Sequence, residues 1–218
     1  MKKFKLLLSA AVLTFMIFDA FAGTRDNAEI IGYSPDGEYA ALKISGIEDG
    51  SGFYYISIRF LNVFKNRFAG PKIFAKQTDD GTVQAVNNEV YRKARPYFEK
   101  FRIDRSITPL ALKLEGSELR KSFKFKDKKH VIQVTEIDTG IQCSSMSGQF
   151  PGKGFSIALD SRILDKVPVP GDSTGCTFAY LIDRALYYRG YVIIIYRAST
   201  PGFEGPDSRV LFSSAALD

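Results

Sequence analysis

The feature that most constrains the fold is a pair of apolar runs joined by a short turn. Ile30–Tyr33 and Tyr39–Ile44 flank the segment Ser34-Pro-Asp-Gly37. Proline pre-sets φ for a turn and glycine accepts a positive φ, so this segment predicts a β-hairpin. The second run is apolar on both of its alternating faces, which indicates a strand that is covered on both sides.

The following stretch extends the hairpin into a larger sheet. Phe53–Phe64 alternates with a period of two, and Phe68–Ala75 predicts a short returning strand that Gly70-Pro71 interrupts. The first quarter of the exported chain therefore predicts a meander of four antiparallel strands. The longer of these strands should place Tyr54, Ile56, Ile58 and Phe60 on one face, and Tyr55, Ser57 and Arg59 on the other.

A change of period marks one helical segment near residues 83–101. Its apolar residues recur three or four positions apart, which is the spacing of one helix face. Asp79 or Asp80 could cap its N-terminus, and Pro96 should kink the helix or divide it in two. The predicted buried face consists of Val86, Val90, Ala94, Phe98 and Phe101.

The second half of the chain predicts further hairpins with short connections. Ser122–Ile137 alternates around a lysine-rich turn, whereas Asp138–Gly154 is expected to be a loop that leads into a short strand at Phe155–Leu159. Near the C-terminus, the four consecutive residues Val192–Ile195 indicate a strand buried on both faces. The sequence thus predicts a mainly β fold of about ten strands in antiparallel meander or hairpin sheets, either sandwich-like or propeller-derived.

The first 22 residues have the pattern of an export signal. Three lysines accompany the start of the apolar run Leu6–Phe18, and Ala20-Phe-Ala22 supplies the small residues of a signal peptidase site. The alternative is a membrane anchor, but a spanning helix needs about 20 apolar residues and Asp19 ends this run earlier. We therefore predict a signal peptide over residues 1–22 and a single mainly β domain over residues 23–218. We expect this domain to be secreted to the periplasm, with no transmembrane segment after cleavage and no nucleic-acid partner.

Export also decides how the two cysteines, Cys143 and Cys176, are interpreted. In an oxidising compartment an even count favours a disulfide, and the alternative is a pair of buried free thiols. The sequence has no paired His or Cys residues that would suggest a metal site. We predict a bridge with a structural role, which would hold down a glycine- and serine-rich segment.

Three loop motifs carry a resemblance to a known family. Gly32–Gly37, Asp49–Phe53 and Pro201–Asp207, with Cys176 before an aromatic-rich strand, resemble the motifs of DUF2259, a family of predicted secreted bacterial proteins. The chain departs from that pattern at Tyr54, where the family often has proline. The resemblance spans essentially the whole exported chain. It implies export and a shared fold, and it brings no activity with it.

A second, weaker resemblance is to the repeat of TolB-like β-propellers. Residues 32–44 together with residues 54–64 resemble most of one propeller blade. A complete propeller needs several such blades, and the sequence contains one good copy. Propeller ancestry is therefore compatible with the sequence, whereas a regular propeller is not supported.

Four carboxylates in two glycine-rich loops are the candidate ligand-binding residues. Glu48 and Asp49 lie in the first loop, and Glu204 and Asp207 lie in the second. Together with loop carbonyls they could bind Ca²⁺, and a pair of them could perform glycosidase-type catalysis. The plainer alternative is that they satisfy the backbone of tight turns.

The remaining residues indicate no catalytic constellation. His130, the sole histidine, follows two lysines at a predicted turn and is expected at the surface, and no Gly-x-Ser-x-Gly motif occurs. We assign no catalytic residue or metal ligand, and expect a non-catalytic envelope protein that binds another envelope protein or a glycan. The alternative is a carboxylate-dependent hydrolase of a glycan or peptide. It requires the two acidic loops to meet, because catalytic carboxyl pairs lie about 5–9.5 Å apart.

Overall fold

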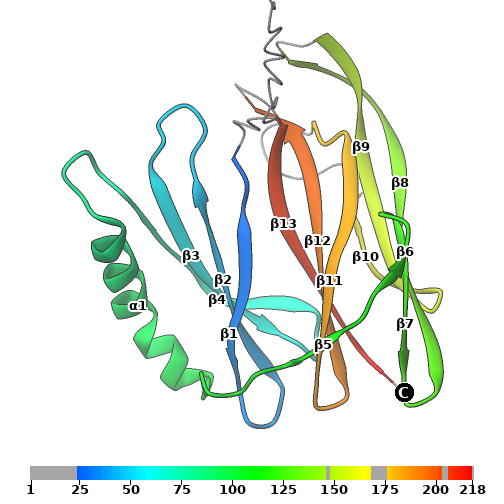
Figure 1. Cartoon of the computed structure of the whole chain (residues 1–218), viewed down its shortest axis with the longest axis horizontal. Helices are drawn as coiled ribbons and strands as arrows, with labels where there is room; N and C mark the ends of the chain where they lie inside the picture. The colour runs from blue at the N-terminus through cyan, green and yellow to red at the C-terminus, as the bar shows by residue number, and fades with distance from the viewer. Residues whose placement is uncertain (1–23, 146–147, 168–175, 203–205, 218) are drawn as a thin grey trace, which may run out of the picture.

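The computed structural model describes residues 24–145, 148–167, 176–202 and 206–217. Within these residues the chain forms three antiparallel sheets and one helix, stacked as layers (Figure 1). The N-terminal sheet is the predicted meander, with the order β1-β2-β3-β4. Its strands are β1 (Asn27–Tyr33), β2 (Tyr39–Ile47), β3 (Tyr54–Asn62) and β4 (Arg67–Lys76).

The other two sheets come from the second half of the chain. The central sheet has the order β13-β12-β11-β5, and the outer sheet has the order β10-β9-β8-β7-β6. The central strands are β5 (Leu110–Leu112), β11 (Ala179–Tyr188), β12 (Tyr191–Pro201) and β13 (Pro206–Ala216). The outer strands are β6 (Glu115–Gly116), β7 (Arg120–Phe125), β8 (Lys128–Ser145), β9 (Gly148–Leu159) and β10 (Arg162–Val167).

Three clusters of buried apolar side chains hold the layers together. One lies between helix α1 (Val83–Lys100) and the N-terminal sheet, a second between the N-terminal and central sheets, and a third between the central and outer sheets. The described strands therefore form stacked sheets, and they close into neither a barrel nor a ring of blades. This arrangement confirms the mainly β, antiparallel prediction in its sandwich-like form.

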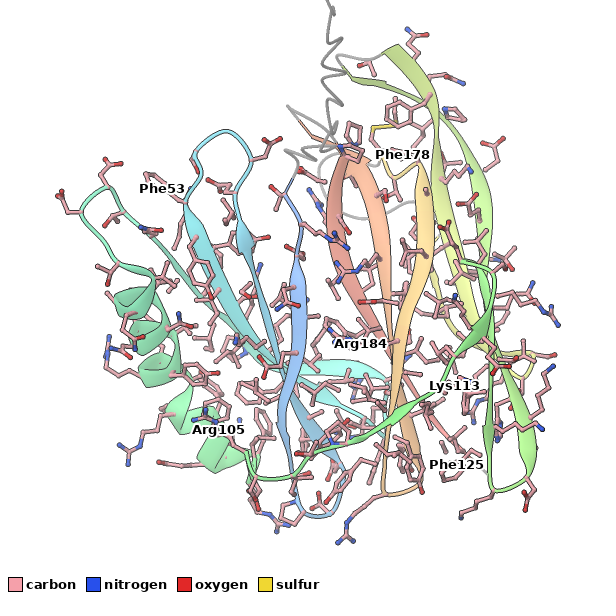
Figure 2. All side chains as sticks on the ribbon, in the orientation of Figure 1. Phe53, Arg105, Lys113, Phe125, Phe178 and Arg184 are labelled. Carbon is pink, nitrogen blue, oxygen red and sulfur yellow. A yellow bond between two sulfur atoms is a disulfide. The ribbon has the colours of Figure 1, made fainter. Side chains whose placement is uncertain are left out.

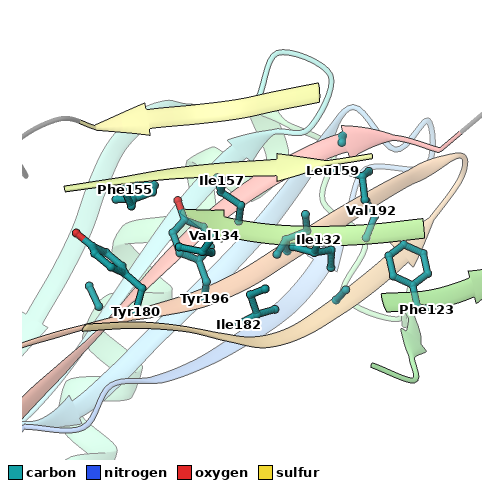
Figure 3. Close-up of a cluster of buried hydrophobic side chains, with 14 residues drawn as sticks. Phe123, Ile132, Val134, Phe155, Ile157, Leu159, Tyr180, Ile182, Val192 and Tyr196 are labelled. Carbon is teal, nitrogen blue, oxygen red and sulfur yellow. The ribbon is translucent and has the colours of Figure 1, made fainter. Parts of the chain in front are cut away.

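The central sheet is covered on both faces, as Val192–Ile195 predicted. Val192 and Ile194 belong to the cluster against the outer sheet, whereas Ile193 and Ile195 belong to the cluster against the N-terminal sheet. Figure 3 shows the first of these clusters, in which β12 faces apolar side chains of β8 and β9. A strand can be apolar at every position only where both of its faces are buried, and this position in the stack explains the run.

The structure bears on two expectations about helix α1. Helix α1 is capped by Thr82, whose Oγ1 accepts the Ala85 N–H at 3.2 Å, and not by Asp79 or Asp80. Of the two outcomes expected of Pro96, division of the helix is wrong, because the helix is continuous over Val83–Lys100, whereas a kink stays a prediction. Aromatic packing of the last turn explains the continuity, because the Phe101 and Phe60 ring centroids lie 5.1 Å apart.

The segment Gly70-Pro71 does not break β4. It forms an irregularity in the pairing with β3, where the register shifts between Ile58 and Phe60 and Gly70 adopts a φ of 72°. A bulge of this kind absorbs residues that cannot join a regular ladder, which is how a strand tolerates proline.

The expected loop over Asp138–Gly154 is wrong. This region is the far part of a long hairpin of β8 and β9, whose register shifts between Asp138 and Gln142. The end of the hairpin extends beyond the central sheet in Figure 1, so its side chains are mostly polar or glycine and lack an apolar alternation. The sequence also missed β10, which pairs with β9 at the edge of the outer sheet.

The two cysteines lie at disulfide-bonding distance, with their Cα atoms 5.6 Å apart. Cys143 lies on β8 and Cys176 precedes β11, so the bridge joins the extended hairpin to the central sheet. Figure 2 shows the pair beside Phe178, which makes an edge-on contact with Phe150. Residues 168–175, which precede Cys176, lie outside the described residues. Among the described residues, no helix is long and apolar enough to cross a membrane.

The double burial of β12 predicts a large effect of core truncation. Ile194→Ala should lower the free energy of unfolding by about 2–5 kcal/mol, because it leaves a cavity at a side chain with no exposed surface. Ile163→Ala, at a β10 side chain that is 62% exposed, is the matched control and should change stability by less than about 0.5 kcal/mol. Urea unfolding followed by circular dichroism measures both. Equal effects of the two substitutions would contradict the layered core.

The cysteine geometry predicts an oxidised pair in the exported protein. Alkylation without reduction should modify neither thiol, and mass spectrometry should find both thiols modified after reduction. Reduction should lower the free energy of unfolding by about 3–4 kcal/mol, the chain-entropy value for a loop of 33 residues. Modification of both thiols without reductant would refute the bridge.

Candidate functional site

The two acidic loops meet at a single residue near the start of the described chain. The Thr24 N–H donates to Asp207 Oδ1 at 2.7 Å, and Thr24 Oγ1 accepts the Asp49 N–H at 2.7 Å. The Thr24 carbonyl oxygen accepts from the Ser208 N–H at 2.7 Å. Residues far apart in the sequence are therefore joined where the N-terminal sheet meets the edge strand of the central sheet.

Negative charge accumulates at this junction. Burial raises the pKa of the Asp207 carboxyl, and the nearby charges of Asp49 and Asp26 raise it further. Hydrogen bonds with Thr24 oppose this shift. The Tyr55 hydroxyl donates to Asp26 Oδ1, and burial with this contact raises the pKa of the Tyr55 phenol. Among the described residues no group of three His, Cys, Asp or Glu side chains has the arrangement of a metal site.

Of the other two acidic candidates, only Glu48 lies in the described part of the chain, and its contacts differ from those of the junction. Glu48 accepts hydrogen bonds from Lys76 and, at 2.7 Å, from Ser51, and both contacts lower the pKa of its carboxyl. Glu48 therefore stabilises the turn that contains it and forms an ion pair with Lys76 of β4. Glu204 lies outside the described residues. The binding role of all four carboxylates stays a prediction.

The expected surface position of His130 is wrong. The side chain is 1% exposed, it stacks on Phe123, and its Nδ1 lies 2.6 Å from Asp160 Oδ2. The lysines beside it in sequence are exposed, whereas alternation along β8 turns His130 toward the core. Its Nε2 has no hydrogen-bond partner, so no nucleophile within the described chain uses this His–Asp pair as a base.

A cavity of about 310 Å³ lies where the edges of the three sheets come together. Edge strands from each sheet contribute to its wall through Phe68 of β4, Leu211 of β13 and Asp165 of β10. Its apolar wall is largely aromatic and includes Phe68, Phe155, Tyr180, Tyr196 and Phe212. The sequence did not predict this site, because its wall comes from strands of all three sheets.

The polar groups of the cavity are few. Arg59 and Arg209 bring positive charge to the wall, and Asp165 brings one carboxylate. Thr200, 3% exposed, also lines the cavity, and its Oγ1 has no hydrogen-bond partner. A mainly apolar wall with a small number of convergent polar groups is the usual composition of a small-molecule site.

The comparison with protein families agrees with the loop motifs. The family described as "Predicted secreted protein (DUF2259)" matches residues 41–215. The chain belongs to this family. No curated protein and no solved structure matches the chain. The DUF2259 match begins within β2 and ends within β13, so it includes strands of all three sheets, the four candidate carboxylates and the residues that line the cavity.

The raised pKa of Asp207 predicts a pH dependence of stability. A carboxyl with a folded pKa above its unfolded value of about 3.9 binds more protons in the folded state. The contribution of Asp207 to the free energy of unfolding therefore falls as the pH rises from the unfolded pKa through the folded pKa. Asp207→Asn keeps an acceptor for the Thr24 N–H and removes the ionisation, so the variant should gain stability relative to the native protein across this pH window.

Thermal unfolding between pH 3.5 and pH 7.5 measures the effect. Asp127→Asn, at an exposed turn between β7 and β8, is the control and should give a profile parallel to that of the native protein. A parallel profile for Asp207→Asn would show that this carboxyl is not destabilised at the junction.

Proposed function

We propose that this exported DUF2259 protein is a non-catalytic binding protein of the periplasm that takes a small, largely apolar ligand into the cavity between its sheets. The observation that supports the proposal best is the cavity itself, with its aromatic wall and few polar groups. Its volume of about 310 Å³ lies at the lower end of the range for small-molecule sites, roughly 300–1,000 Å³. The ligand is therefore small.

The surrounding structure supports a preformed site. The cavity residues Tyr180 and Tyr196 are buried, and each hydroxyl has a hydrogen-bond partner. The Tyr180 hydroxyl donates to the Lys153 carbonyl oxygen at 2.9 Å, and the Tyr196 hydroxyl lies 3.4 Å from Ser213 Oγ. Asn66, in the β3–β4 turn, donates to the Leu164 carbonyl oxygen of β10 at 2.9 Å and so links two of the contributing edges. Fixed walls reduce the entropy that a ligand loses on binding.

The hydrolase remains the alternative, and the meeting of the acidic loops at Thr24 is the observation that favours it. In the binding proposal these contacts serve to attach the N-terminal residues to the central sheet. Release of soluble fragments from purified peptidoglycan by the exported protein, lost in Asp207→Asn, would support the hydrolase instead.

Dye binding tests the cavity. N-phenyl-1-naphthylamine, a neutral aromatic probe, should bind the exported protein with one-to-one stoichiometry and enhanced fluorescence. Ala198→Phe should abolish this binding, because Ala198 lines the cavity on β12 and a phenyl ring would occupy the space. Leu110→Ala removes an exposed apolar side chain of β5 and should leave the titration unchanged. Undiminished binding to a folded Ala198→Phe protein would overturn the proposal.

A further inference from the structure

Arg59 differs from the other partly buried arginines between the sheets. Arg197 pairs with Asp183 at 3.1 Å and also donates to the Asp26 carbonyl oxygen. Arg184, labelled in Figure 2, donates to the Ala28 carbonyl oxygen of β1. In the described part of the chain the Arg59 side chain has neither an ion pair nor a hydrogen bond, and its guanidinium carbon lies 3.4 Å from the centre of the Phe68 ring.

The position of Arg59 makes this lack of a counter-charge unfavourable. The residue lies on the face of β3 that is directed toward the central sheet, and it lines the cavity. Burial lowers the pKa of its guanidinium, which nevertheless remains charged at any physiological pH. A partly desolvated cation with five N–H donors is stabilised by contact with an oxyanion, and arginine matches carboxylate and phosphate in a bidentate geometry.

Two other charged side chains, Arg209 and Asp165, line the cavity with Arg59. Arg209 is a second cation in the wall, and it has an interaction partner of its own. Asp165 is the opposing carboxylate, and its Oδ1 accepts the N–H of Lys166 at 2.8 Å. Within the described residues Asp165 forms no ion pair with Arg59, so the charge of Arg59 is uncompensated at the cavity and favours an anionic ligand over a cationic one.

The outer edge of β13 also carries an uncharged hydrogen-bond donor, the backbone N–H of Phe212. The N–H groups of Ser208, Val210 and Ser214 donate to Thr24 O, Asp26 Oδ2 and Asn66 Oδ1, all outside the central sheet. Alternation along an antiparallel strand directs the N–H of Phe212, which lines the cavity, to this same outer edge. The Phe212 N–H is therefore an outward-facing donor on a strand that contributes to the cavity wall.

We propose that the ligand of this cavity is a small acidic amphiphile, an apolar body carrying one carboxylate, sulfonate or phosphate group, and that Arg59 binds the anionic group. The inference rests on the proposed function and specifies the ligand class for the same site. The aromatic wall contacts the apolar body, and the guanidinium group of Arg59 selects the acidic group.

A matched pair of dyes tests the charge preference. 8-Anilino-1-naphthalenesulfonate has the ring system of N-phenyl-1-naphthylamine with one added sulfonate. The native exported protein should bind the sulfonate at least about tenfold more tightly than the neutral dye, since charge-assisted hydrogen bonds are the stronger class. Arg59→Gln should weaken sulfonate binding about tenfold and change neutral-dye binding by less than about twofold.

Two further variants keep the result interpretable. Arg59→Lys retains the charge without the planar fork and should bind the sulfonate with intermediate affinity. Ala198→Phe should abolish binding of both dyes. Thermal unfolding checks that each variant is folded, and Arg59→Gln should unfold at a temperature close to that of the native protein because it breaks no ion pair.

Each outcome decides between the two proposals. If both dyes bind the native protein equally, or if Arg59→Gln weakens both equally, the acidic-ligand inference fails and the binding function stands. If neither dye binds, or if Ala198→Phe leaves both unaffected, the proposed function itself fails. A tenfold loss confined to the sulfonate supports both.

Discussion

The burial of the central sheet on both faces is the constraint on which the rest of the structure depends. Val192 and Ile194 pack toward the outer sheet, and Ile193 and Ile195 pack toward the N-terminal sheet. A sheet that is apolar on both faces requires a layer on each side, so β12 dictates a stack of three sheets. Helix α1 then covers the remaining apolar face of the N-terminal sheet. The cavity follows from this stacking, because it lies where the edges of the layers meet.

The sequence predicted those parts of the fold that depend on local patterns. The meander, the hairpin at Ser34–Gly37, the apolar helix face and the double burial of Val192–Ile195 all rest on periodicity within a short window. It failed where a tertiary contact overrode the local signal. Packing of Phe101 on Phe60 keeps the helix continuous past Pro96. The far part of the β8–β9 hairpin pairs through its backbone with little apolar alternation, so its strands resembled a loop.

The candidate site, too, combines features that local sequence patterns predict with features that depend on tertiary contacts. Alternation placed Arg59 on the correct face of β3, yet nothing local indicated that it would lack a counter-ion or line a cavity. The wall also includes Asp165 of β10, a strand that the sequence missed. The acidic loops could be identified from their composition, but their meeting depends on Thr24, a residue with no distinctive pattern. A site built from the edges of separate sheets cannot be predicted from local sequence patterns, because its residues come from segments that are far apart in the chain.

The central claim is that the gap between the sheet edges is a binding site with Arg59 as its charged contact. A crystal structure of the exported protein with 8-anilino-1-naphthalenesulfonate tests it most directly. The account predicts one dye in the cavity, its rings against Phe155 and Tyr196 and its sulfonate within hydrogen-bonding distance of the Arg59 guanidinium. A cavity without dye, with the dye bound only at exposed apolar residues such as Leu110 or Ile163, would contradict it.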